Sequence, residues 1–147
     1  PIPDDMIYDK DVDIYAPCAL GATINDDTIP RLKCSIIAGA ANNVLKDPNK
    51  HSKELLSKGI LYAPDYAINA GGLINVYNEL EDYNKDRAFS QAEAIYDILM
   101  DIFYRSDKEC IPTTIASDRK AEERINKISS LKSFYLPNRR KTFLKGR

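Results

Sequence analysis

The chain has 147 residues, 21 basic and 22 acidic side chains, and a single histidine, His51. A chain of this length forms one domain with a sizeable core, and its balanced charge gives no general attraction to nucleic acid or to membranes. One histidine provides no material for a zinc site or a serine-histidine triad, and no apolar run approaches the roughly 18 residues needed to cross a bilayer.

The termini and cysteines indicate the context of the chain. Pro1–Asp5 lacks the charged and apolar regions of a signal peptide, and a first residue other than methionine suggests a trimmed or partial polypeptide. The three cysteines are odd in number and far apart, which fits reduced thiols in a cytoplasm: Cys18, Cys34 and Cys110. The basic tail is interpreted as a solvated terminus, with a phosphate-binding arm as the alternative: Arg139–Lys141, Lys145 and Arg147.

Strands and short helices alternate in the first part of the chain. Short apolar or β-branched runs predict three strands at 12–16, 34–38 and 60–63, ending at Pro17, Gly39 and Pro64. The second run is continuous enough to predict a strand buried on both faces. A weak helical segment at 26–32 and a helix at 50–58, closed by Gly59, separate them. This order predicts parallel βαβ units, and therefore part of a doubly wound sheet.

The remainder of the chain is predicted to be helical. Apolar residues at helical spacing predict helices over about 68–80 and 86–105, and a third that begins near Pro112. The residues expected to face inward on the first are Ile68, Leu73, Val76 and Leu80; on the second, Ala88, Ala92, Ile95, Leu99 and Ile102; the third presents Ala121, Ile125, Ile128 and Leu131.

The loops after the three strands share small and amide side chains. Residues 16–22 are mostly small, 38–43 end in two asparagines, and 69–72 read Asn-Ala-Gly-Gly. Because parallel strands end at one edge of a sheet, these loops are expected to form one wall for an uncharged, flat ligand such as a nicotinamide ribose. The adjacent glycines are costly in a helix, so they indicate either close approach of a ligand or tight packing of the helix on the sheet.

Long motifs in these segments resemble a known family. D-I-Y-A-P-C-A-L-G-A (13–22), I-A-G-A-A-N-N-V-L-K (37–46) and Y-A-P-D-Y-A-I-N-A-G-G-L-I-N-V (62–76) resemble the leucine dehydrogenase branch of the glutamate/leucine/phenylalanine/valine dehydrogenases, and the likeness extends to the closing L-K-G-R. The resemblance implies an α/β fold. It would comprise a partial Rossmann-type NAD-binding domain over 1–80 and a helical segment over 81–147, which packs on that domain and toward a substrate domain outside this chain.

The resemblance also implies roles for individual residues. Pro17, Cys18 and Ala19 would line the cofactor path, Asn42 would bond the nicotinamide ribose, and Asn69 the nicotinamide carboxamide. The wall of the substrate side-chain pocket would be formed by Leu73 and Val76. The family oxidatively deaminates L-amino acids to 2-oxo acids and ammonia with reduction of NAD, as homo-oligomers.

Catalytic residues are not expected in this chain, because the family's catalytic lysine and aspartate lie in the substrate domain. No G-x-G-x-x-G occurs either. Asp65 is interpreted as a turn or cap residue, with an acid as the alternative, and Cys18 as a small hydrophobe rather than a nucleophile. Two hypotheses remain. The chain is the inactive C-terminal part of a branched-chain amino acid dehydrogenase, or it is a free-standing, non-catalytic assembly module.

Overall fold

The computed structural model describes residues 4–133, with side-chain environments for 5–130. The expected basic tail lies outside the described residues. Three parallel strands stand in the order β1-β2-β3 (β1 Ile14–Tyr15, β2 Ile36–Ile37, β3 Leu61–Tyr62). Their register pairs Ile14 with Ile36 and Ile36 with Leu61. The sequence placed all three strands and their direction correctly, but each is only two residues long.

One face of this small sheet is buried and the other is open. Tyr15, Ile37 and Tyr62 are buried, whereas Ile14 and Leu61 are exposed on the opposite face. Side chains alternate across a strand, so the register places each set on one side. The expectation that 34–38 is buried on both faces is therefore wrong for Ile36, which is only partly covered among the described residues. A continuous apolar run does not reveal whether both sides have a neighbour.

Short helices before and between the strands complete the core around the buried face. These are η1 (Asp4–Asp9), η2 (Ile29–Arg31) and α1 (Pro48–Ser57). Asp47 caps α1 by accepting from the backbone N–H groups of Asn49 and Lys50, and Pro48 occupies the first turn, where it needs no N–H partner. Gly59 follows the last residues of α1 at φ 71°, as predicted for a helix-ending glycine. The core includes Ile24, Ile37, Val44 and Leu55.

The predicted helix over 68–80 is divided into α2 (Asp65–Ile68) and α3 (Gly71–Leu80). Asn69 and Ala70 lie between the two helices, and Ala70 accepts the first hydrogen bond of α3 from Ile74. The inward face predicted for this helix is wrong, because Leu73, Val76 and Leu80 are exposed. The side of α3 that faces α4 carries Ile74 and Asn78 instead.

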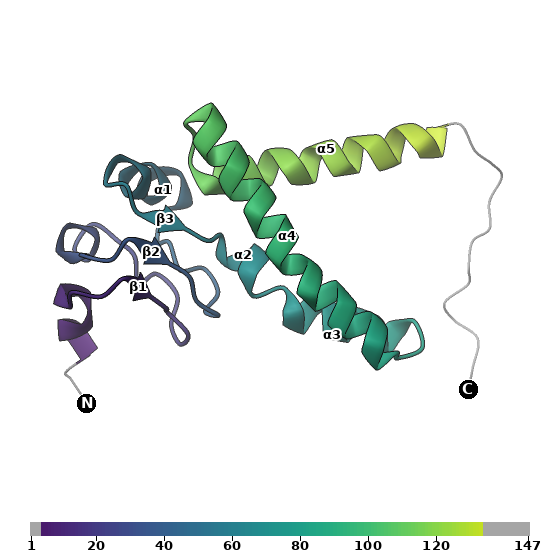
Figure 1. Ribbon diagram of the computed structural model, residues 1–147, viewed down its shortest axis with the longest axis horizontal. Coiled ribbons are helices and arrows are strands. Elements are labelled where there is room, and N and C mark those ends of the chain that lie inside the picture. The colour runs from purple at the N-terminus through teal and green to yellow at the C-terminus, as the bar shows by residue number, and fades with distance from the viewer. Residues whose placement is uncertain (1–3, 134–147) are drawn as a thin grey trace.

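The two remaining helices diverge from a point beside α1 (Figure 1). They are α4 (Lys85–Glu109) and α5 (Thr113–Ser133), and α3 packs along the first part of α4. The inward face predicted for α4 is confirmed, with Ala88 and Ile102 buried. On α5 only the first turns are covered; Ala121, Ile125 and Ile128 are exposed, and Leu131 lies outside the described side chains. No described helix is long and apolar enough to cross a membrane.

Candidate functional site

The loops at the carboxyl ends of β1 and β2 contact each other closely. The backbone N–H of Ala41 donates to the Pro17 carbonyl (3.0 Å), and that of Ala22 donates to the Asn43 carbonyl (2.7 Å). A Cβ atom on Gly39 would lie 2.1 Å from the Pro17 carbonyl oxygen. Gly39 therefore allows a contact between the two loops that no other residue would permit. The predicted meeting of these loops is confirmed.

The loop after β3 joins them through two amide side chains. Asn69 Nδ2 donates to Asn42 Oδ1 (2.6 Å) and, more weakly, to the Ala41 carbonyl (3.4 Å). Both donor hydrogens of the Asn69 amide are then engaged. Among the described residues, no hydrogen bond uses Asn69 Oδ1 or Asn42 Nδ2. The pair, called here the amide pair, thus offers one acceptor and one donor group to a ligand.

A buried carboxylate fixes the amide pair in place. Asp65, in the first turn of α2, accepts from the Val44 N–H (3.0 Å) and from the Tyr66 N–H (2.9 Å). It therefore joins the loop that carries Asn42 to α2, which Asn69 directly follows. Asp65 thus has a structural role, but the role is a bridge between this loop and α2 rather than the helix cap that the sequence suggested as one possibility. Burial, followed by the nearby Asp65 charge, raises the pKa of Tyr62, whose hydroxyl accepts from the Asp65 N–H.

The other predicted site residues differ in their exposure. Pro17 is buried with its carbonyl bonded, whereas Cys18 and Ala19 are exposed on the same loop. Gly71 and Gly72 have open space where a Cβ atom would stand. Packing against the described residues therefore does not explain the glycine pair. The carboxyl-edge site, defined as Pro17–Ala19, the amide pair and Gly71–Gly72, is built from all three loops.

Two side-chain clusters lie outside this site, and the sequence did not indicate either. In the first, His51 Nδ1 accepts from the Asp47 N–H (3.0 Å), so Nε2 carries the proton and faces Asp26 (3.3 Å). Asp26, His51 and Glu54 each place a possible metal-ligand atom within 4.8 Å of the others. Lys50 pairs with Asp26 and holds the pKa of that carboxyl below its usual range, with His51 adding to the effect. The cluster ties α1 to the turn at 26–28, which precedes η2.

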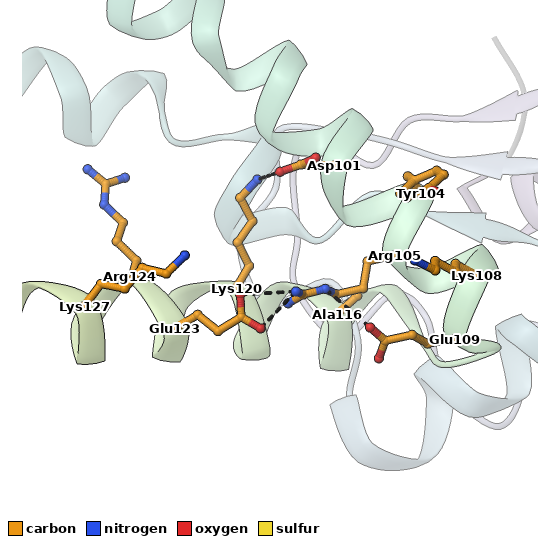
Figure 2. Close-up of a pocket in the computed structure, with 10 residues that line it drawn as sticks. All are labelled: Asp101, Tyr104, Arg105, Lys108, Glu109, Ala116, Lys120, Glu123, Arg124 and Lys127. Carbon is orange, nitrogen blue, oxygen red and sulfur yellow. Dashed lines mark hydrogen bonds and ion pairs between the residues drawn. The ribbon is translucent and has the colours of Figure 1, made fainter.

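The second cluster lines a groove of about 470 Å³ between α4 and α5 (Figure 2). Arg105 reaches Glu123 (2.9 Å) and Glu109 (3.5 Å), and Lys120 pairs with Asp101, which lowers the pKa of the Asp101 carboxyl. The pairs of Arg105 with Glu123 and of Lys120 with Asp101 join the two helices where they diverge. The groove shares no lining residue with the carboxyl-edge site. Each of the three carboxylates that line it is already in an ion pair with a basic side chain, so the groove indicates helix packing rather than a reaction centre.

Comparison with known proteins agrees with the geometry. A family model described as glutamate/leucine/phenylalanine/valine dehydrogenase matches residues 1–131. The chain belongs to this dehydrogenase family. It is 53% identical over 136 residues to a leucine dehydrogenase of Thermoactinomyces intermedius, covering 92% of this chain and 37% of the relative.

A second relative acts on a different amino acid, judged by its name. The chain is 55% identical over 127 residues to an L-tryptophan dehydrogenase of Nostoc punctiforme, covering 86% of this chain and 36% of the relative. The crystal structure of L-tryptophan dehydrogenase from Nostoc punctiforme superposes with a TM-score of 0.84 at 54% identity, over 86% of this chain and 38% of that one. The partial α/β, Rossmann-type fold is thus shown, and the chain spans little more than a third of its relatives.

Proposed function

We propose that this chain is the NAD-binding, C-terminal part of an amino acid dehydrogenase. The complete enzyme would oxidise branched-chain L-amino acids, chiefly L-leucine and also isoleucine and valine, to 2-oxo acids and ammonia. The observation that carries the proposal is the amide pair, Asn42 and Asn69, held at the carboxyl edge of three parallel strands with an acceptor and a donor still unused. Membership of the dehydrogenase family supports oxidative deamination as the class of reaction.

The amide pair fits a nicotinamide riboside. A carboxamide ligand presents a donating NH₂, which Asn69 Oδ1 would accept, while Asn42 Nδ2 would donate to a ribose hydroxyl. Exposed small side chains at Cys18 and Ala19 leave room for a flat ring against the loop. NAD, when bound, supplies the hydride acceptor. The residues of this chain bind the nicotinamide end and fix which face of the ring meets the substrate.

The substrate side chain is proposed to rest on α3. Leu73 and Val76 are exposed on α3, which begins two residues after Asn69. An apolar wall rejects a side-chain carboxylate, because that charge would be desolvated without a partner. It accepts an aliphatic side chain, for which the same surface provides favourable burial.

The remaining machinery is assigned to polypeptide beyond this chain. By resemblance, the lysine that polarises the developing carbonyl, the general acid/base aspartate and the glycine-rich phosphate turn belong to the rest of a full-length relative, and this chain covers 37% of such a relative. Residues 1–80 would form the second half of the NAD-binding domain, and 81–147 would pack on it and toward the substrate domain. A cytoplasmic homo-oligomer is the proposed setting.

Assay of the complete polypeptide tests this proposal. The reading frame upstream of Pro1 is expected to encode G-x-G-x-x-G and a lysine-bearing, glycine-rich loop. The purified product should reduce NAD with L-leucine and release ammonia and the 2-oxo acid. No activity with any L-amino acid, from a protein whose frame contains both motifs, would contradict the proposal. A frame that begins near Pro1 and yields a stable, inactive protein would favour the alternative, a free-standing assembly module derived from such an enzyme.

A further inference from the structure

The helix α3 has apolar residues on two opposite sides. One side of α3 packs along α4 (Figure 1), and contacts with α4 assign Ile74 and Asn78 to this side. The other side is exposed and carries four large side chains, with these exposed fractions: Leu73 74%, Val76 54%, Tyr77 53% and Leu80 78%. These four residues, called here the open face of α3, are spaced by three, four and seven positions, so they form one continuous stripe.

A buried polar network fixes which side of α3 is open. The Asn78 side chain is fully buried. Its Nδ2 donates to Gln91 Oε1 on α4 (2.7 Å), and its Oδ1 accepts from Arg87 Nε (2.5 Å). Arg87 also donates to the carbonyls of Glu81 and Asp82 in the turn between the two helices. Rolling α3 about its axis would take the buried Asn78 amide away from Gln91 and Arg87, and leaving a buried amide unpaired is costly. The open face is therefore held away from α4.

Tyr77 lies within this face beside the two residues of the proposed substrate wall. It is four positions after Leu73, which places their Cβ atoms about 5–6 Å apart. An amino acid side chain that rests on Leu73 and Val76 is then within reach of the Tyr77 ring. Tyr77 is also the largest side chain of the open face, so it takes up more of the available space than any neighbour there.

We infer that Tyr77 sets the upper size limit of the substrate side-chain pocket. Its ring closes the side of the pocket formed by α3 beyond Leu73, so the pocket accepts aliphatic side chains and admits aromatic ones poorly. This inference rests on the proposed function and adds to it a residue that determines specificity. Relatives at similar identity are named for leucine and for tryptophan, two amino acids whose side chains differ in size.

Kinetics of the complete enzyme with Tyr77→Ala and Tyr77→Phe test the inference. Because Tyr77→Ala removes the ring, the kcat/KM ratio of L-phenylalanine to L-leucine should rise about tenfold or more. Tyr77→Phe keeps the ring and should leave the ratio unchanged. The matched control is Tyr96→Ala, which removes an exposed tyrosine from α4 and should not alter the ratio.

The outcomes separate the inference from the proposed function. If the wild-type enzyme oxidises leucine but the ratio stays within twofold in Tyr77→Ala, the inference is overturned. A fall in the ratio also overturns it, because the ring would then be a platform for aromatic substrates. If the wild-type enzyme oxidises no amino acid, the proposed function fails first. Should Tyr77→Ala not fold, Tyr77→Val makes the same comparison with a smaller change, and thermal unfolding identifies which variants are intact.

Discussion

Removal of the Asp65 carboxylate should release the loop that carries Asn42. Asp65 is buried and accepts from the Val44 N–H at 3.0 Å and the Tyr66 N–H at 2.9 Å. A hydrogen bond to a charged group contributes about 1.5–3 kcal/mol, and the Tyr66 N–H is partly open to water, so Asp65→Ala should cost about 2–4 kcal/mol locally. That cost corresponds to roughly 30- to 700-fold faster amide exchange of the loop.

Hydrogen–deuterium exchange of residues 41–46 in the complete polypeptide measures this directly. Asp65→Asn should give a smaller effect, about 1–3 kcal/mol, because the amide keeps one acceptor but sets an NH₂ against one of the two donors. Asp27→Ala, which removes an exposed carboxylate, is the control and should change nothing. Unchanged exchange in Asp65→Ala would refute the structural role. If Asp65→Asn exchanges its amides at the wild-type rate but loses activity, the alternative interpretation of Asp65 as an acid would be supported.

Three further results are expected. Gly72→Ala should stabilise the fold by up to about 1 kcal/mol, since nothing lies within 4 Å of the added Cβ, but it should lower the turnover of the complete enzyme. Unchanged turnover would contradict the approach of a ligand to Gly72. The control is Gly59→Ala, which should destabilise the fold because Gly59 has a φ of 71°. Asp47→Ala should cost about 1 kcal/mol in thermal unfolding by uncapping α1, and no loss would show that the cap is replaceable. Burial, together with the nearby Asp118 charge, raises the pKa of Tyr66 from the usual 10 to about 12. The protonated Tyr66 hydroxyl therefore stabilises the folded state fully below pH 10, and this stabilisation is lost as the pH rises toward 12. Tyr66→Phe should remove that part of the alkaline loss, and an unchanged pH profile would contradict it.

Local patterns predicted the sheet and its loops well because the deciding signals are short-range. Runs of β-branched and apolar residues ending at Pro17, Gly39 and Pro64 mark the strand ends, and parallel strands necessarily bring their following loops to one edge. The meeting of the loops at that edge brings Asn42 and Asn69 close together, but the hydrogen bond between them could not be predicted from the sequence.

The facing of the helices was harder to predict, because it depends on neighbours. Periodicity indicated that Leu73 and Val76 turn inward, whereas a buried asparagine, Asn78, holds the other side of α3 against α4. A search for apolar residues at helical spacing does not detect a buried polar residue such as Asn78, although its hydrogen bonds determine how this helix is rotated about its axis. The spacing of Ile125 and Ile128 predicted an apolar stripe on α5, and the helix has this stripe, but none of the described residues covers it.

The measurement that tests the central claim most directly is NADH affinity in a cycle of Asn42→Ala, Asn69→Ala and the double variant of the complete polypeptide. Because the two amides bond each other at 2.6 Å and both face the ligand in this account, each single change should weaken NADH binding about 2- to 10-fold. Together they should depart from additivity by at least about 0.5 kcal/mol. Wild-type affinity in Asn69→Ala, with the fold intact, would contradict the assignment of this edge to the nicotinamide.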